Sequence, residues 1–296
     1  MTWVVLTLVA AFLWSATNVI NKFLIEKYIK EPIIFLVVFG LLGILMLFVA
    51  PFVNFFIPSA FLLLIIFVTG GIYMYAALPY FSALRYEEVS RVTALWQLSP
   101  IFVFLISFMT LGETLSFTQA ISFSLLVLGG VLVAIKFSNG KMRWSKAIWG
   151  MLLSTLLFAV YTVLIKYIFT QTDVWNGIIW VRVSMFVHAL ILLSFPSVRR
   201  KMKDFLSLPI KIKSILVGSE IVAAIAAVFY AIAVSLIAVA LVEALLSFQP
   251  VFVFIISIIL SLRFKNILEE RMDFKNMIVK SLGIILVVVG MLVLYF

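Results

Sequence analysis

The chain contains no cysteine and only one histidine in 296 residues. Disulfide bonds and thiolate metal centres are therefore excluded. Its three aspartates, Asp173, Asp204 and Asp273, all fall in predicted loops, and neither a glycine-rich phosphate loop nor an HExxH motif occurs. We therefore predict that the protein is not an enzyme and that it uses no cofactor and no metal.

Charge is also scarce, because Asp, Glu, Lys and Arg make up 11% of the chain while hydrophobic residues make up 66%. A soluble domain usually carries about 25% charged residues to cover its surface. Most of this surface must instead face hydrocarbon, which predicts an integral membrane protein. The first apolar run has no basic residues before it, so we interpret it as a membrane span rather than a cleaved signal.

Apolar runs of about 20 residues, the length that crosses a bilayer as a helix, recur along the whole chain. Charged residues, proline or asparagine separate them. The runs do not alternate as the strands of a membrane barrel would, so the predicted fold is all-α. Ten spans are predicted, at residues 3–25, 32–53, 60–83, 89–110, 116–136, 147–169, 176–196, 212–234, 238–262 and 277–296.

The fourth and ninth runs repeat each other. QLSPIFVFLIS begins at Gln97 and SFQPVFVFIIS begins at Ser247, so an offset of 150 places Pro100 on Pro250. This repeat predicts two five-helix units, residues 1–143 and 144–296. Because five is an odd number, the second unit must enter the membrane from the opposite side, and the two units form an inverted repeat.

The distribution of basic residues supports the inversion. Twenty of the 22 lie in or beside odd-numbered loops, and the exceptions are Lys166 and Arg182. Basic residues mark cytoplasmic loops, so the bias predicts a multi-pass protein of the cytoplasmic membrane with both termini outside. The net charge of +10 is thus spread over loops that flank spans rather than gathered in a patch, and we predict no nucleic-acid partner.

Several sequence motifs resemble those of the EamA type of the drug/metabolite transporter superfamily. They are LWSATNVINK at Leu13–Lys22 with its echo at Phe158–Lys166, LGETLSF at Leu111–Phe117, and the glycine-ended fifth and tenth spans. The resemblance implies a ten-helix transporter. Two features depart from the family. After the ninth span, where the second unit would repeat the LGETLSF motif, the chain has a longer charged segment at 263–275. The family is also commonly drawn with both termini in the cytoplasm.

Transporters built from inverted repeats bind substrate near the bilayer midplane, between the two copies. Polar residues on apolar spans are costly there and tend to be functional. Glu220 on the eighth span is the first candidate, either as a protonatable or cation-binding group or as a structural residue. Glu243 and Ser247, spaced i and i+4, predict a cavity-facing stripe on the ninth span, and Gln97 matches Ser247 on the fourth.

Arg182 enters its span from the same side as Glu243, so the two side chains either pair or Arg182 holds an anionic group. Lys22 and Glu220 are the corresponding pair on the inner side of the membrane, and the same two interpretations apply to them. His188 is interpreted as a packed residue. Glu220 and Glu243 are the candidates for proton coupling. The predicted substrate-binding residues are Trp14, Asn18, Tyr80, Trp96, Gln97, Tyr161, Arg182, Glu220, Tyr230, Glu243 and Ser247.

The sequence therefore predicts a secondary transporter that moves a small metabolite, an amino acid or an amphipathic compound, by alternating access, with proton coupling and exchange both left open. Small multidrug pumps of the superfamily use a glutamate in their first span, where this chain has Trp14 and Asn18, which disfavours antiport of cationic drugs. The alternatives are a flippase or scramblase for a lipid-linked group and a helper subunit without transport. The expected partners are a small-molecule substrate and the lipid bilayer, with a monomer or a homodimer left open.

Overall fold

The computed structural model of the protein describes residues 2–86, 95–134, 146–263 and 274–295. All regular elements in these residues are helices, which confirms the all-α class. Seven helical stretches are long and apolar enough to cross a membrane, and two of them, Ile33–Phe52 and Val239–Ile256, each combine consecutive helices. Three shorter apolar helices accompany them at Ser99–Leu111, Phe117–Val133 and Ile278–Val293. Ten spans were predicted, and a full count of ten crossings is not established.

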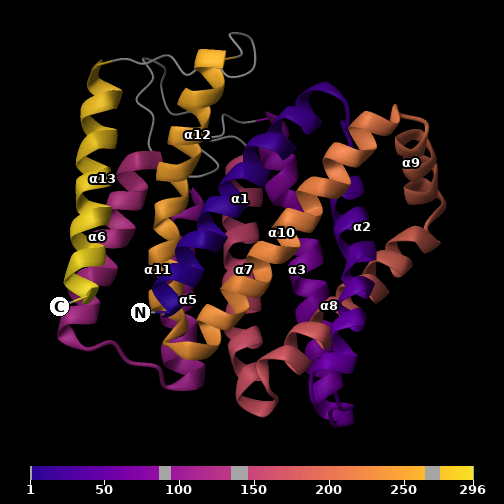
Figure 1. Ribbon diagram of the computed structural model, residues 1–296, viewed down its shortest axis with the longest axis horizontal. Coiled ribbons are helices and arrows are strands. Elements are labelled where there is room, and N and C mark those ends of the chain that lie inside the picture. The colour runs from indigo at the N-terminus through magenta and orange to yellow at the C-terminus, as the bar shows by residue number, and fades with distance from the viewer. Residues whose placement is uncertain (1, 87–94, 135–145, 264–273, 296) are drawn as a thin grey trace.

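The described helices follow one another with short connections (Figure 1). In chain order they are α1 (Thr2–Lys27), α2 (Ile33–Leu42), the 3-10 helix η1 (Gly43–Phe52), α3 (Ala60–Tyr86), α5 (Ser99–Leu111), α6 (Phe117–Ala134), α7 (Lys146–Gln171), α8 (Val174–Ser194), α9 (Pro196–Leu206), α10 (Ile210–Leu236), α11 (Val239–Leu245), the 3-10 helix η2 (Leu246–Phe248), α12 (Gln249–Arg263) and α13 (Phe274–Tyr295).

Three predicted spans are not the continuous helices expected. Residues 238–262 divide into α11, η2 and α12, residues 32–53 divide into α2 and η1, and the helix before Gln97 ends in a turn from which α5 restarts. The two restarts coincide with prolines. Pro100 lies in the first turn of α5 and Pro250 in the first turn of α12, where the missing N–H costs no helical hydrogen bond.

The segment 196–206 was expected to be a loop and is instead the helix α9. Val198 and Phe205 lie seven residues apart and are both buried, so they share one face of this helix. The basic residues Arg199, Arg200 and Lys203 occupy other positions around it. The prediction failed because an amphipathic helix needs only a few apolar anchors, and the charge of this segment concealed them.

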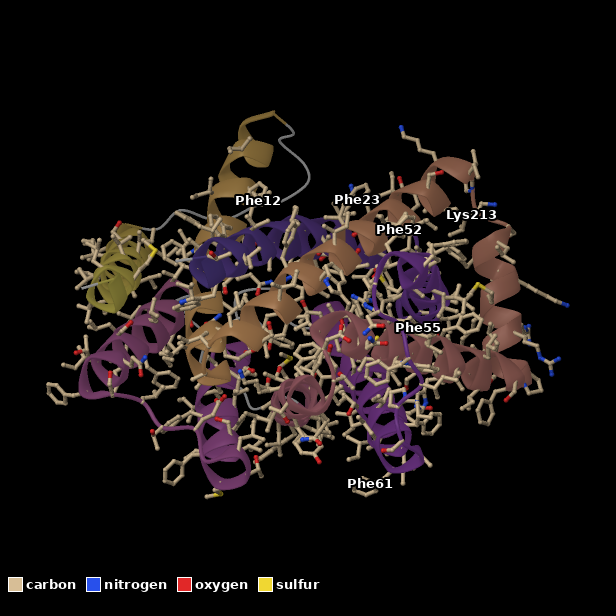
Figure 2. All side chains as sticks on the ribbon, turned by 60° about the horizontal axis from the view of Figure 1, so that its bottom comes forward. Phe12, Phe23, Phe52, Phe55, Phe61 and Lys213 are labelled. Atoms are coloured by element: carbon tan, nitrogen blue, oxygen red, sulfur yellow. The ribbon has the colours of Figure 1, made fainter. Side chains whose placement is uncertain are left out.

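Large apolar side chains point outward around the molecule (Figure 2). Phe52 is 86% exposed and Phe61 68% exposed, exposures that would be costly in water. At one side of the molecule α6 packs along α13 (Figure 1). A Cβ atom added to Gly129 or to Gly283 would lie 2.7 Å from the carbonyl oxygen of the other, so glycine is required for the two helices to approach this closely.

Candidate functional site

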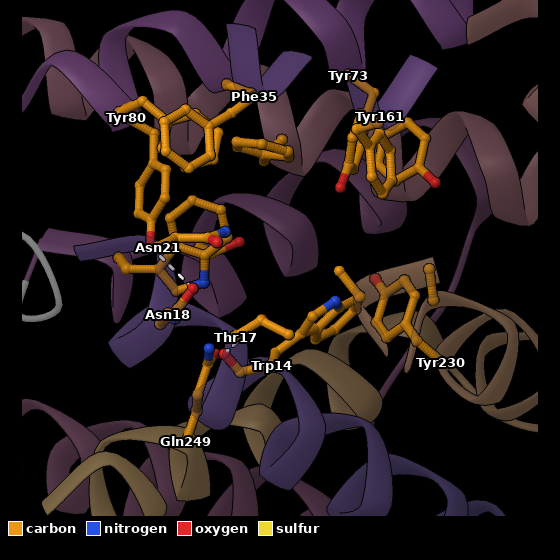
Figure 3. A pocket seen from close by; sticks show the side chains of 18 of the residues that line it. Trp14, Thr17, Asn18, Asn21, Phe35, Tyr73, Tyr80, Tyr161, Tyr230 and Gln249 are labelled. Carbon is orange, nitrogen blue, oxygen red and sulfur yellow. Dashed lines mark hydrogen bonds between the residues drawn. The ribbon is translucent and has the colours of Figure 1, made fainter. Parts of the chain in front are cut away.

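A cavity of about 160 Å³ lies among the helices at the centre of the molecule. Figure 3 shows Tyr73, Tyr80 and Tyr161 along one side of it, with Trp14 and Tyr230 along the other. The wall is supplied by the helices α1, α2, α3, α5, α7, α10, α11, η2 and α12, together with the short helical segment that contains Trp96. Both halves of the chain therefore contribute to it.

Eight of the eleven predicted binding residues line this cavity. They are Trp14, Asn18, Tyr80, Trp96, Tyr161, Glu220, Tyr230 and Glu243. The residues that sequence reasoning missed include Thr17, Asn21, Tyr73, Ser99, Phe158, Thr162 and Gln249. Asn21 was recoverable, because it lies three residues after Asn18 and seven after Trp14 on one helical face.

Gln97 and Ser247 were predicted to line the cavity and lie outside its wall. Both are buried beside Gly130 of α6, and neither the Gln97 Nε2 atom nor the Ser247 Oγ atom has a hydrogen-bond partner. The predicted stripe assumed 3.6 residues per turn. Ser247 instead lies in a 3-10 helix, whose three residues per turn rotate the following side chains onto another face.

Arg182 is the third predicted residue that lies outside the wall. Its guanidinium carbon lies 4.6 Å from the centroid of the Phe39 ring, and Phe39 itself faces the cavity. The Arg182 Nη2 atom donates a hydrogen bond to the carbonyl oxygen of Ala224 at 3.4 Å. The Arg182 guanidinium thus stacks on a cavity-lining ring and still interacts electrostatically with Glu220.

Three hydroxyl groups surround the carboxylate of Glu243. Tyr230 donates to Oε1 at 2.5 Å, Thr162 donates to the same oxygen at 3.4 Å, and Ser99 donates to Oε2 at 3.1 Å. The anticipated partner Arg182 is not among these groups. A buried carboxyl group held by hydroxyl donors from α5, α7 and α10 is fixed in position, and no described basic side chain forms an ion pair with it.

Glu220 has sparser surroundings on the neighbouring wall. Its Oε1 atom accepts a hydrogen bond from Asn21 Nδ2 at 3.4 Å. The other end of that amide, Asn21 Oδ1, accepts from Ser219 Oγ at 2.9 Å. Lys22, the predicted inner partner of Glu220, forms an ion pair with Glu26 at 2.8 Å.

Aromatic rings form a continuous wall on the α3 side of the cavity. Tyr73 contacts Phe158 with ring centroids 5.3 Å apart, Phe158 contacts Trp96 at 4.8 Å, and Trp96 contacts Tyr80 at 5.3 Å. The Tyr80 hydroxyl donates to Asn18 Oδ1 at 3.2 Å. On the other wall Trp14 packs against Tyr230 at 5.4 Å.

A polar cluster joins the end of α10 to the start of α11. Lys166 donates to the carbonyl oxygens of Val234 at 2.8 Å and Ile237 at 2.9 Å. Glu113, from the LGETLSF phrase, accepts from the backbone N–H of Val239 at 3.0 Å and lies 3.9 Å from Lys166 Nζ. The phrase that carried the family resemblance therefore fixes the break between two cavity helices.

His188 is buried at a distance from the cavity wall. Its ring stacks on Phe67 with centroids 4.4 Å apart, and its two nitrogen atoms lie within hydrogen-bond distance of Phe67 O and the Tyr75 hydroxyl. This is the packed histidine that the sequence predicts. Across the described residues, no three His, Asp or Glu side chains gather as a metal site would require.

The comparisons with known proteins agree with the resemblance read from the sequence. Residues 1–135 match the EamA-like transporter family, which confirms the resemblance over that part of the chain. A search of curated proteins found no match. One solved crystal structure, described only as that of a protein, is 15% identical with a TM-score of 0.68, and the alignment covers 98% of this chain and 95% of the other. At that identity the likeness concerns the fold alone.

Proposed function

We propose that this chain, whose first 135 residues match the EamA-like transporter family, is a secondary transporter of the drug/metabolite type that carries a small amphipathic metabolite. The observation that carries the proposal is the central cavity, which helices from both halves of the chain line with buried carboxylates, amides and aromatic rings. A site that mixes polar and aromatic groups at membrane depth suits a substrate with an apolar body and a polar group.

The transport cycle that we propose is alternating access between two inverted five-helix units, residues 1–143 and 144–296. Ten crossings would consist of the seven long spans and the three shorter apolar helices. Support comes from the matching helix breaks, since α5 and α12 restart beside Pro100 and Pro250, 150 residues apart. Broken helices that meet at the midplane are a feature of transporters built from inverted repeats.

A proton gradient is the driving force that we propose, acting through Glu220. Its one hydrogen-bonding partner among the described side chains is the amide of Asn21. An amide can donate to a carboxylate, or turn over and accept from a protonated carboxyl group. Glu220 therefore has a suitable partner in both protonation states, as a residue that binds and releases a proton needs.

We further propose a place in the cytoplasmic membrane, with α9 on the cytoplasmic side and both termini outside. The basic residues of α9 favour this orientation. Figure 1 marks both chain ends at the lower left and α9 at the upper right. A small molecule and the bilayer are the proposed partners.

The proposal is tested by a thermal-stability screen of the purified protein against amines, amino acids, sugar phosphates, nucleobases and short-chain lipids. A ligand that binds only the folded protein raises its melting temperature by mass action. We expect at least one soluble compound to do so and to be transported by proteoliposomes. Stabilisation by lipids alone would instead favour a flippase, and no stabilisation by any compound would favour a helper subunit.

A further inference from the structure

Two acidic side chains, and no described basic one, line the cavity wall. Glu220 and Glu243 both line it, and no Lys or Arg does so among the described residues. Arg182, the basic residue beside the cavity, stacks on the ring of Phe39 and interacts electrostatically with Glu220. In the part of the chain that the structure describes, neither carboxylate takes part in an ion pair. A buried carboxylate is normally paired, so a cationic ligand in the cavity would supply the partner that an ionised Glu243 lacks.

We propose that the cavity selects an organic cation, a compact ammonium compound with an aromatic body, and that Glu243 is the residue that binds the ammonium group. This inference rests on the proposed transport function, whose substrate class it names. A bound cation would supply the missing counter-charge, and the surrounding rings would accommodate the apolar body.

The hydrogen bonds of Glu243 leave room for one more donor. A carboxylate offers about four lone-pair sites. Oε1 accepts from both Tyr230 and Thr162, whereas Oε2 accepts only from Ser99. Glu243 lines the cavity, so an ammonium group in the cavity can donate to Oε2 without displacing any of the three hydroxyls. The hydroxyls hold the carboxylate in place before the ligand arrives, which lowers the cost of ordering it on binding.

The aromatic rings favour a cation over a neutral or anionic molecule. A cation within about 6 Å of the centre of a Trp or Tyr ring is attracted by the negative face of the ring. Tyr230 donates directly to Glu243, and Trp14 packs against Tyr230 with centroids 5.4 Å apart. An ammonium group at Glu243 therefore lies close to two aromatic side chains that both line the cavity.

Amino acids, expected from the sequence as one substrate class, fit this wall less well. Their carboxylate would enter a cavity that already contains two glutamates and presents no described basic side chain. Like charges brought together in a binding site disfavour the wrong partner strongly. The sequence argument against cationic substrates rested on the absence of an acidic residue in the first span. The acidic residues of this cavity come instead from α10 and α11, as Glu220 and Glu243.

The size of the cavity limits the ligand. An engineered apolar cavity of about 150 Å³ binds benzene, and the present cavity measures about 160 Å³. A ligand with one ring and a short amine chain is therefore the appropriate probe. Phenethylamine, phenylalanine and 2-phenylethanol form a matched set, because they share the phenylethyl body and differ in the ammonium and carboxylate groups.

The test measures the melting temperature of the detergent-solubilised full chain with each of the three compounds over the same concentration series. We expect phenethylamine to stabilise the protein at concentrations more than about tenfold lower than phenylalanine or 2-phenylethanol. We expect Glu243→Gln to abolish this preference. Glu31→Gln is the control, because Glu31 is a partly exposed acid paired with Lys201 at 2.5 Å outside the cavity.

Three results would overturn the inference: equal or better stabilisation by phenylalanine, equal stabilisation by 2-phenylethanol, or an amine preference that survives in Glu243→Gln. In each of them a soluble ligand still binds, so the proposed transport function stands while its substrate class changes. Failure of every compound in the broader screen would remove both proposals. If Glu243→Gln does not fold, the inference is decided by how strongly each of the three compounds stabilises the unaltered protein.

Discussion

Glu243 and Glu220 lie in the same cavity, but their surroundings differ. Hydroxyls from three helices hold Glu243, whereas Glu220 has a single amide at 3.4 Å. Both are almost completely buried, with 6% and 4% of their surfaces exposed, so burial does not distinguish them. The difference matches the two roles that we propose, a positioned carboxylate that binds a cation and a loosely held one that exchanges a proton.

The largest expected effect is the difference in cation uptake between variants of the two carboxylates. Proteoliposomes would take up benzyltrimethylammonium, whose permanent charge prevents it from crossing the bilayer unaided. Its quaternary nitrogen has no N–H to donate, so its uptake tests the charge attraction of Glu243 and not the hydrogen bond to Oε2. We expect Glu243→Gln to lower uptake about 100-fold, because removing one partner of a desolvated charge pair costs roughly 2–5 kcal/mol. Glu220→Gln should retain exchange of the cation. Equal losses in the two variants would show that the carboxylates do not differ in role.

A second experiment tests whether Glu220 couples transport to a proton gradient. With a pH gradient imposed, the unaltered protein should accumulate the cation above the level reached without a gradient. Glu220→Gln should reach the same level with and without the gradient, since glutamine binds no proton. Gradient-driven accumulation that persists in Glu220→Gln would remove Glu220 from the coupling mechanism.

A third prediction concerns the hydroxyls of Glu243. Tyr230→Phe keeps the ring and removes the donor at 2.5 Å, and we expect a loss of about 2 kcal/mol of stability, typical of a hydrogen bond to a charged group. Asn21→Ala near Glu220 should cost about 1 kcal/mol or less. The measurement is denaturation of both purified variants in detergent, and a larger loss for Asn21→Ala would invert the comparison.

The smallest effect is expected at Gln97, whose Nε2 atom is buried without a partner. Replacing an unsatisfied amide by an apolar group of similar shape is nearly neutral or stabilising. We therefore expect Gln97→Met to change stability by less than about 0.5 kcal/mol and to leave uptake of the cation unchanged. A strong loss of uptake with normal stability would place Gln97 in the transport pathway after all.

Much of the fold was predictable, because long apolar runs have few ways to cross a membrane. Hydrophobicity located the helices but not their breaks. The 3-10 turn at Leu246–Phe248 depends on packing against α6, and it turns Ser247 away from the cavity in a manner that no helical pattern would predict. The helix α9 was missed for the opposite reason, since its charges dominate its composition.

The candidate site was predictable where chemistry singled residues out. Carboxylates such as Glu220 and Glu243 are rare on apolar spans, and the cavity contains both. Ser99 and Thr162 were not found because small hydroxyl residues are common in membrane helices and usually bond to their own backbone. Their contact with Glu243 joins residues 144 and 81 positions apart, a relation that only the folded chain reveals.

The most direct test of the central claim is a structure of the protein with phenethylamine bound. We predict that the amine nitrogen lies within about 3 Å of Glu243 Oε2, the separation of a charge-assisted hydrogen bond, with the phenyl ring among the aromatic side chains of the wall. An amine nitrogen that contacts Glu220 and leaves Glu243 to its three hydroxyls would contradict the account.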